Sequence, residues 1–346
     1  MLAAAVALVP VVLFLGLLVL LDSFKLVRGT AVAFAIGCGA AAAVAAIPLT
    51  RGVESTLQLS PQAVVRYAGP LLEEALKLLL IAFLLSRRRV GFLVDAGVLG
   101  FATGAGFALA ENLVFLGALE RGNLWLWMVR GVGTAILHGG TTSVAAMLAK
   151  QLVDAAPARL ARALLAGLAM ATVLHSAYNH LLLPPVMATL VLLIVFSLLV
   201  LVLFERSEAA TREWVGAGLD LDVELLDLLS SEAFHGTRFG RYLAELRERF
   251  PGPVVVDMFC LLRLELELAV QAKALLITRK AGLDMPVHPD VTAGLRELDH
   301  LRASIGPTGL LALKPLHVTS HRDDWHRYLV AETHGARWWV RLIRRV

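Results

Sequence analysis

Ionisable and amide side chains lie within segments that are otherwise apolar, and they gather in four consecutive segments of the chain. A charge at the centre of a bilayer costs about 2.5–3.5 kcal/mol on insertion scales, so such residues usually face the interior of a helix bundle and serve a function. The apolar segments on either side of the four contain essentially none. We therefore expect one polar site, whose members are Glu73, Glu74, Lys77, Glu111, Asn112, Arg130, His138, His175 and Asn179; His180 lies in the same segment as the last two.

The spacing of Glu73, Glu74 and Lys77 is suited to general base catalysis. Residues three and four apart are neighbours on a helix, so Lys77 can lie against either carboxylate. One carboxylate is then compensated, and the other has no counter-charge in a low-dielectric site. Such a carboxylate can take a proton from water near neutral pH. We predict that Glu73 or Glu74 activates a water molecule.

His175 and Asn179 are four residues apart, so a helix presents both side chains to the same spot. An imidazole there could ligate a metal, donate to an oxyanion or act as a base. An amide could orient a water molecule or complete an oxyanion hole. His180, which follows, is interpreted as an interfacial or structural residue. For any one of these residues, a structural hydrogen bond between helices is the alternative.

Residue counting places the polar side chains of the four segments at one depth. Glu73 lies about 15 Å below the outer end of its segment, because each helical residue rises 1.5 Å. Glu111, His138 and His175 also fall between the outer quarter and the midplane when each is counted from the outer end of its own segment. Agreement among four helices is what a single site requires.

The apolar segments predict a polytopic membrane protein. A spanning helix needs about 20 mostly apolar residues, because the hydrocarbon core is roughly 30 Å thick. The fold class that we expect is all-α: a membrane bundle of about seven helices in residues 1–204 and a helical soluble domain in residues 205–346. The predicted spans are Leu2–Leu21, Thr30–Leu49, Ala63–Leu85, Val90–Leu119, Leu124–Ala149, Ala163–Leu182 and Pro185–Phe204.

Composition excludes several other classes of protein. The 346-residue chain is 58% hydrophobic and 17% charged, with a mean hydropathy of +0.73, whereas globular proteins are about 25% charged. A soluble single-core enzyme, a disordered chain and a secreted disulfide scaffold are therefore excluded. Cys38 and Cys260 form no spacing motif, so we expect no Cys-based zinc site. Basic residues between apolar segments explain the net charge of +4, and no nucleic-acid partner is expected.

Basic residues in the connections predict the orientation in the membrane. Eight Lys and Arg residues lie in the connections after the first, third and fifth spans, and three lie on the other side. Cytoplasmic loops carry the excess of positive charge. We expect a multi-pass protein of a bacterial-type cell membrane, with the N-terminus outside. The domain 205–346 is then cytoplasmic, where it is available to a regulatory protein.

Four short motifs each lie in a predicted membrane helix of their own. Glu73–Lys77 is E-E-x-x-K, and Phe107–Asn112 is F-x-x-x-E-N. Arg130 is followed eight residues later by His138, and His175–Asn179 is H-x-x-x-N. Any one motif is weak alone, whereas four in this order specifically resemble the PrsW family of intramembrane proteases, a distant relative of the CAAX prenyl proteases. The resemblance covers roughly residues 1–204.

The resemblance implies hydrolysis of a peptide bond within or near the membrane. The expected substrate is a single-pass membrane protein in the lipid bilayer, cleaved near its extracytoplasmic side, as in the first-step cleavage of a transmembrane anti-sigma factor. The resemblance also implies residue roles. Glu73 and Glu74 supply the water-activating carboxylate; the other catalytic residues are Glu111, His138, His175 and Asn179, and the supporting residues are Lys77, Asn112 and Arg130.

The motifs leave the use of a metal open. A catalytic zinc commonly has three protein ligands and keeps one position for water. His138, His175 and Glu111 satisfy that count, so one divalent ion such as zinc is one expectation and a metal-free glutamate mechanism is the other. Two further classes stay open beside the protease. Buried Glu, Lys and His also form the proton relays of ion or solute transporters, and the chain could be a catalytically inactive membrane binding protein.

Overall fold

The computed structural model describes residues 2–22, 27–87, 89–118, 124–156, 159–180, 182–283 and 289–316, and every regular element within them is helical. The predicted all-α fold class is therefore confirmed. The chain divides into two compact units, Met1–Glu208 and Ala209–Val346.

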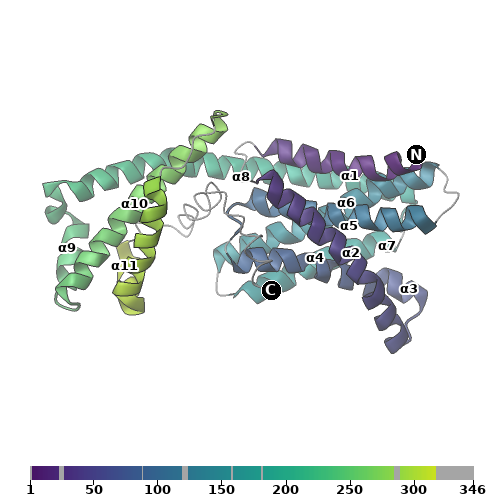
Figure 1. Cartoon of the computed structure of the whole chain (residues 1–346), viewed down its shortest axis with the longest axis horizontal. Helices are drawn as coiled ribbons and strands as arrows, with labels where there is room; N and C mark the ends of the chain where they lie inside the picture. The colour runs from purple at the N-terminus through teal and green to yellow at the C-terminus, as the bar shows by residue number, and fades with distance from the viewer. Residues whose placement is uncertain are drawn as a thin grey trace. The chain divides into compact units, whose positions relative to one another are not determined.

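The first unit is a bundle of long helices (Figure 1). Its last helix begins at Pro185 and continues to Ser230, beyond the predicted end of the final span at Phe204. No proline follows Phe204 to stop the helix before Ser230. The elements are α1 (Leu2–Leu21), α2 (Gly29–Leu57), α3 (Pro61–Ala63), the π-helix η1 (Val64–Ala68), α4 (Gly69–Ser86), α5 (Leu93–Ala118), α6 (Leu124–Ala155), α7 (Leu160–Asn179) and α8 (Pro185–Ser230).

Within the described residues, six helices are long and apolar enough to cross a membrane: α1, α2, α5, α6, α7 and α8. The seventh predicted span, Ala63–Leu85, corresponds to the end of α3, η1 and α4. Helix α4 has 18 residues, and its three charged side chains, Glu73, Glu74 and Lys77, distinguish it from these six helices. A helical membrane bundle fits these elements.

Helices α5 and α6 form the centre of the bundle. In each of them, 83% of the most apolar stretch is buried, compared with 22% in α1 and in α7 and 33% in α2. Helix α1 packs on both central helices, α2 packs on α4 and α5, and α7 packs on α4 and α6. Helix α4 also contacts both α5 and α6. The four helices that carry the predicted polar site therefore form one contiguous group.

Small residues set how closely α2 approaches α5. A Cβ atom on Gly39 of α2 would lie 1.8 Å from the carbonyl oxygen of Thr103 on α5, and a Cβ atom on Gly106 of α5 would lie 2.0 Å from that of Ile36. Neither glycine leaves room for a side chain, so the two helices cross in backbone contact. Small residues allow this close packing in membranes, where lipid offers no hydrophobic drive between helices.

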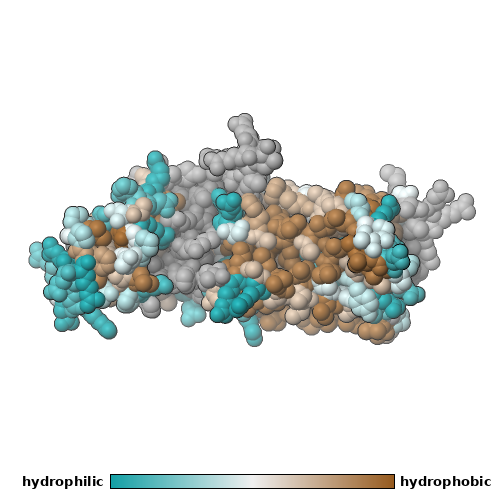
Figure 2. Space-filling model, turned by 90° about the horizontal axis from the view of Figure 1, so that it is seen from below, coloured by the Kyte–Doolittle hydropathy of each residue, from teal (hydrophilic) through white to brown (hydrophobic). Residues whose placement is uncertain are grey.

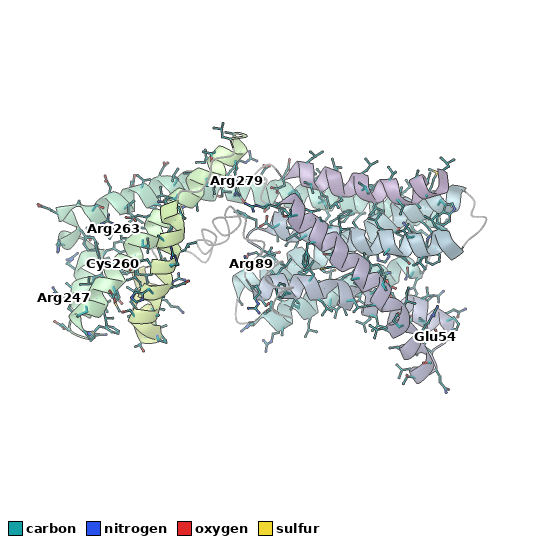
Figure 3. The ribbon with its side chains drawn as sticks, viewed as in Figure 1. Glu54, Arg89, Arg247, Cys260, Arg263 and Arg279 are labelled. Carbon is teal, nitrogen blue, oxygen red and sulfur yellow. The ribbon has the colours of Figure 1, made fainter. Side chains whose placement is uncertain are left out.

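The surface of the first unit is apolar along its length and more polar at its ends. Figure 2 shows its hydrophobic residues as a continuous brown area with teal, hydrophilic residues gathered toward both ends. Leu13, Val173 and Leu198 are among the exposed apolar side chains of this unit. Glu54 near the end of α2 and Arg89 after α4 lie at opposite ends of the bundle (Figure 3). Such a surface suits a protein surrounded by lipid between two aqueous phases.

The second unit has an apolar core of its own. Met258 of α10 and Leu298 of α11 are fully buried at its centre. Arg302 of α11 contacts Glu265 of α10 at 2.7 Å, which joins the two long helices by an ion pair. The described part of this unit is helical, as predicted for the tail. Its elements are the end of α8, the 3₁₀-helix η3 (Glu232–Gly236), α9 (Arg238–Leu246), α10 (Gly252–Lys280), α11 (Pro289–Leu313) and the 3₁₀-helix η4 (Lys314–Leu316).

Candidate active site

Glu74 is a fully buried carboxylate held by three donors. Its Oε1 lies 2.7 Å from Nζ of Lys77, one turn along α4, and 3.0 Å from Oγ1 of Thr141 on α6. The same oxygen lies 2.8 Å from Nδ1 of His175 on α7. Neither Glu74 nor Lys77 has exposed side-chain surface. A buried charge is tolerated only when it is paired and hydrogen-bonded, and this carboxylate meets that condition with groups from three helices.

Lys77 extends the network to α6 and α5. Its Nζ lies 3.1 Å from Nδ1 of His138. An ammonium group only donates, so Nδ1 accepts and the proton of the neutral imidazole lies on Nε2. That nitrogen donates to Oε2 of Glu111 at 3.1 Å. The ring of Phe107 covers these contacts, 4.8 Å from the ring of His138 and 5.0 Å from Nζ of Lys77.

Arg130 supports Glu111 from the far side. Its Nη2 lies 3.5 Å from Oε1 of Glu111, and its guanidinium carbon lies 3.6 Å from the centre of the Phe115 ring. Stacking on an aromatic face stabilises a guanidinium group that is partly removed from water. Glu111 is therefore bound through both of its oxygens, one to an arginine and one to a histidine.

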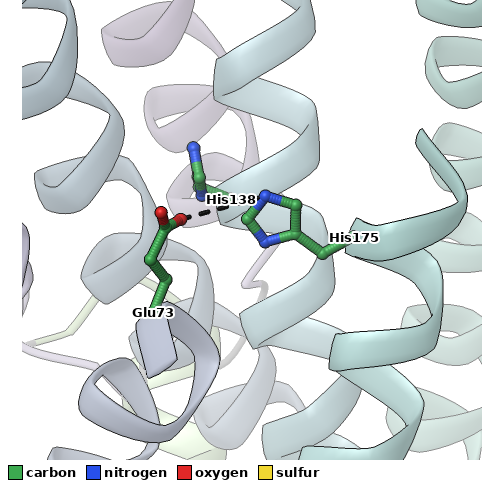
Figure 4. Close-up of side chains that lie close together, drawn as sticks. All are labelled: Glu73, His138 and His175. Carbon is green, nitrogen blue, oxygen red and sulfur yellow. Dashed lines mark ion pairs between the residues drawn. The ribbon is translucent and has the colours of Figure 1, made fainter. Parts of the chain in front are cut away.

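Glu73 and His175 face each other across a short gap. Oε2 of Glu73 lies 3.8 Å from Nε2 of His175, which is longer than a hydrogen bond. Because Nδ1 of His175 donates to Glu74, Nε2 is the ring nitrogen that faces Glu73. The ring of His138 stands nearly perpendicular to that of His175, with centres 5.0 Å apart. Figure 4 shows the side chains of Glu73, His138 and His175 converging from three helices.

Access to a cavity distinguishes the two adjacent carboxylates. A cavity of about 270 Å³ lies between α2, α4 and α5, and Glu73 and Glu111 line it together with apolar residues of α2 and α5. The side chain of Glu73 is 23% exposed and that of Glu111 is 29% exposed, whereas Glu74 has no exposed surface. Glu73 therefore meets the cavity, and Glu74 belongs to the packed interior.

Glu73, His138 and His175 also form a group that could hold a metal ion. Each offers a ligand atom, and in this group, found among the described residues, those atoms lie within 4.8 Å of one another. Two imidazoles and one carboxylate are a common donor set of catalytic zinc, which keeps a further position for water. Glu74 holds the other ring nitrogen of His175, as carboxylates usually do for histidine ligands. The donor set therefore fits a divalent ion, which would replace Lys77 or Glu111 as the partner of one ring nitrogen of His138.

A proline explains the π-helix that precedes α4. Pro70 has no N–H group, so it cannot donate to the carbonyl of Arg66 four residues back or to that of Val65 five residues back. The N–H of Gly69 bonds five residues back to the carbonyl of Val64, in the π pattern. Pro70 thus leaves two neighbouring backbone carbonyls without their helical donors.

Side chains of α7 bind both of these carbonyls. Oγ of Ser176 donates to the carbonyl of Arg66 at 2.5 Å, and Nδ2 of Asn179 donates to that of Val65 at 2.9 Å. Both donors belong to the same helix as His175, which directly precedes Ser176. The two bonds therefore fix the position of α7 against η1 and, with it, the ring of His175 beside the carboxylates of α4.

Asn112 of α5 also joins neighbouring helices through hydrogen bonds. Its Nδ2 donates to the carbonyl of Ala7 at 2.9 Å and contacts Oγ1 of Thr134 at 3.1 Å. Asn112 is fully buried. It connects α5 to α1 and α6 and holds the helix that carries Glu111.

The comparisons with known proteins agree with this arrangement. A family model described as PrsW family intramembrane metalloprotease matches residues 28–204, just over half of the chain. The chain belongs to the PrsW family. The matched region includes all four helices of the site and excludes α1 and the second unit. No match was found among curated proteins or among solved structures.

Membership in the PrsW family supports intramembrane peptidase activity, with a membrane protein as substrate and lipid as the environment. The chain is a multi-pass membrane protein, as predicted. The family is described as a metalloprotease family, and the Glu73, His138 and His175 group provides a place for an ion. These findings favour the protease among the three functional classes that the sequence left open.

The structure of this PrsW-family chain brings most of the predicted site residues together. The sequence suggested Glu111 as a metal ligand beside His138 and His175. In the structure Glu111 hydrogen-bonds to His138, and the third residue of the group that could share an ion is Glu73. The catalytic roles stay predictions for all six residues: Glu73, Glu74, Glu111, His138, His175 and Asn179. His180 contacts the carbonyl of Ser176 and the hydroxyl of Tyr67, which fits its structural interpretation. The residues that converge are Glu73, Glu74, Lys77, Glu111, Arg130, His138 and His175; Asn112 and Asn179 bond to backbone carbonyls instead.

Sequence reasoning missed Thr141 and Ser176. Thr141 donates to Glu74, and Ser176 donates to Arg66. A hydroxyl group is common in apolar helices and does not stand out as a charge does. Spacing provides a weak signal for Thr141, because it follows His138 by three residues and lies on the same face of α6.

The contact between η1 and α7 predicts a double-mutant cycle. Ser176→Ala should lower stability by about 0.5–1.5 kcal/mol, because the carbonyl of Arg66 loses its donor. The loss should be smaller when Pro70 is replaced by Ala, since the new N–H at position 70 can bond to Arg66. Thermal unfolding of the four proteins in detergent measures the coupling. Equal losses with and without the proline would contradict this account.

Proposed function

We propose that this chain is an intramembrane endopeptidase that hydrolyses a membrane-anchored protein near its extracytoplasmic side. The observation that carries the proposal is the position of Glu73, a carboxylate beside two imidazoles at the wall of a cavity. Family membership supports the reaction class.

Glu73 is the carboxylate that activates water. Glu74 is bound by Lys77 and His175, and Glu111 is bound by His138 and Arg130, with contacts of 2.7 to 3.5 Å. The closest ion-pair contact of Glu73 is the 3.8 Å approach to His175. Its carboxylate is therefore the least committed of the three and meets the cavity, as a general base toward water must.

The reaction is an addition of water across the peptide bond. Glu73 takes a proton from the water molecule while the water oxygen bonds to the carbonyl carbon. The C–N bond then breaks, the amine nitrogen takes up a proton, and the products are a new C-terminal carboxylate and a new N-terminus. Nε2 of His175 faces the same gap, 3.8 Å from Oε2 of Glu73, where an imidazole can transfer a proton to or from the reacting atoms. Both ring nitrogens of His138 are hydrogen-bonded, to Lys77 and to Glu111, so His138 positions the site.

Glu74 and Lys77 position the reacting groups. Glu74 fixes the ring of His175 through Nδ1, and Lys77 fixes that of His138 through Nδ1. Both supports lie inside the packed bundle, away from the cavity. The side chains that meet substrate therefore rest on buried ones that do not need to move.

Glu73, His138 and His175 are the residues that would hold a divalent ion such as zinc. A bound ion of this kind lowers the pKa of its water ligand and polarises a carbonyl group. Glu73 is required with the ion as much as without it, because it belongs both to the ligand group and to the cavity wall.

The substrate that we propose is a single-pass membrane protein, similar to a transmembrane anti-sigma factor that undergoes first-step cleavage. The distribution of basic residues supports an extracytoplasmic position for the ends of α2, α5 and α7. Glu73 lies in the second turn of α4, which begins at the same end of the bundle. The scissile bond is then close to the outer end of the substrate's own helix.

Glu73→Gln should lower cleavage by about 10²–10⁴-fold, the usual cost of losing a general base. The measurement is quantitative mass spectrometry of new N-termini in membranes of cells that produce the wild-type chain or the variant. Glu54→Gln, on the exposed end of α2, is the matched control and should behave as wild type. Cleavage by the Glu73→Gln protein at the wild-type rate, at equal abundance, would reject the proposed base.

Metal analysis of the purified chain should find about one divalent ion per molecule, as a three-ligand catalytic site would bind. His175→Ala should remove most of that ion, and His180→Ala, which lies outside the triad, should retain it. A strong chelator should abolish cleavage, and zinc should restore it. Full activity in a metal-free preparation would assign the chemistry to Glu73 and the two histidines alone.

The second unit is proposed as a cytoplasmic module that binds a regulatory protein, supported by its separate core and by its position outside the family match. Its exposed thiol, Cys260, tests the side of the membrane. In a Cys38→Ala background, an impermeant maleimide should label Cys260 only after cells are permeabilised. Ser55→Cys, at the exposed end of α2, should react in intact cells. The reverse pattern would invert the topology and exclude extracytoplasmic cleavage.

The second unit should be dispensable for the chemistry, because the site residues all lie in the first unit. A chain truncated after Glu208 should therefore retain Glu73-dependent cleavage.

A further inference from the structure

The cavity beside Glu73 is a groove between the second halves of α2 and α5. We propose that it receives the substrate as an extended segment from the lipid side, with one apolar side chain seated among Ala43, Ala46 and Ala110. This inference rests on the proposed function, because it names the part of the substrate that the same site binds.

The groove follows from where α2 and α5 touch. The two helices are in backbone contact at Gly39 and Gly106. All of the groove residues contributed by α2 lie beyond this crossing, from Ala43 to Arg51. In Figure 1, α2 crosses the bundle diagonally and its far end points away from α5 and α6. The helices therefore diverge from a tight crossing, and the space between them widens toward the end of α2.

The form of the substrate follows from where its peptide bond must lie. In an α-helix the backbone carbonyl and N–H groups bond to one another inside a sheath of side chains, so an intact helix in the groove would present side chains, and not a peptide carbon, to Glu73. An extended chain can place its backbone against the carboxylate and one side chain in the groove, because alternate side chains point to opposite sides. A helical substrate has to unwind locally before its peptide bond reaches the carboxylate.

The chemistry of the lining sets the kind of side chain accepted. Ala43 and Ala46 are buried and pack with Phe107, and Ala110 packs against the same cluster. Three methyl groups and an aromatic ring bound an apolar pocket whose depth depends on the alanines. A larger residue at any of these positions would fill the space that we assign to the substrate side chain.

A cation at the open end of the groove indicates a second contact. Arg51 lies at the rim, is exposed, and has no ion-pair partner in the part of the chain that the structure describes. It stands five residues, more than one helical turn, beyond Ala46 on α2. An acidic side chain in the substrate, placed past the apolar one toward the membrane surface, complements this charge.

The test uses the full purified chain in liposomes with synthetic single-pass peptides. Each peptide has an apolar helix of about 20 residues and a six-residue flanking segment in which one position is Ala, Val, Leu or Phe. Mass spectrometry gives the cleavage site and kcat/KM. Ala46→Leu should lower kcat/KM for the Leu and Phe peptides by about 10-fold or more, and for the Ala peptide by less than about threefold. Ala41→Leu, on the exposed face of α2, is the matched control and should leave all four values unchanged.

Equal effects of Ala46→Leu on all four peptides, or no effect, would overturn the proposed pocket. If that variant does not fold, Arg51→Glu provides the second measurement: it should reverse a preference for Glu over Lys in the outer part of the flanking segment. An unchanged charge preference would remove Arg51 from the groove contacts.

Cross-linking separates this inference from the proposed function. In the Glu73→Gln chain, a photo-reactive residue at Ile47 should capture the peptide, whereas the same group at Ala41 should not. Capture at position 47 without any cleavage by the wild-type chain would retain the groove and reject the peptidase. Cleavage without selective capture at position 47 would retain the peptidase and reject the groove.

Discussion

The ion pair between Lys77 and Glu74 has no exposed surface and lies inside an apolar bundle. Breaking a buried pair by removing one partner commonly costs about 3–5 kcal/mol, because the other charge is left uncompensated. In this chain the pair also supports both histidines: Glu74 bonds to His175, and Lys77 bonds to His138. The geometry of α6 and α7 at the site therefore depends on two charges of α4 that do not reach the cavity.

This dependence explains why two neighbouring glutamates have different surroundings. Successive residues on a helix point about 100° apart, so α4 directs Glu74 into the packed interior and Glu73 toward α2 and α5. Glu74 then carries the structural charge, and Glu73 keeps exposed surface beside His175. A lone carboxylate would have to satisfy both requirements, burial for support and access for chemistry. The pair of residues separates them within one turn.

The helices and the polar cluster could be predicted from sequence because ionisable residues in apolar segments are costly and therefore conspicuous. The separate tasks of Glu73 and Glu74 could not be predicted, since spacing allows Lys77 to pair with either one. The packing of α4 against its neighbours determines which of the two carboxylates is buried beside Lys77. Asn179 was expected near the chemistry, yet it bonds to a carbonyl that Pro70 leaves without a helical donor. That partner follows from a backbone irregularity in another helix, which periodicity in α7 does not reveal.

Hydrolysis in a bilayer places opposed demands on the protein, because water and substrate must enter while backbone groups exposed to hydrocarbon must stay bonded. In this bundle the two demands fall on different sides of α4. The backbone carbonyls of Val65 and Arg66, in the irregular segment before α4, accept hydrogen bonds from side chains of α7. The groove lies on the side of α2, where intact helices present alanines beside the carboxylates. The three hydrogen bonds of Glu74 run to α4, α6 and α7, so a substrate in the groove on the α2 side meets Glu73 without displacing this charged support.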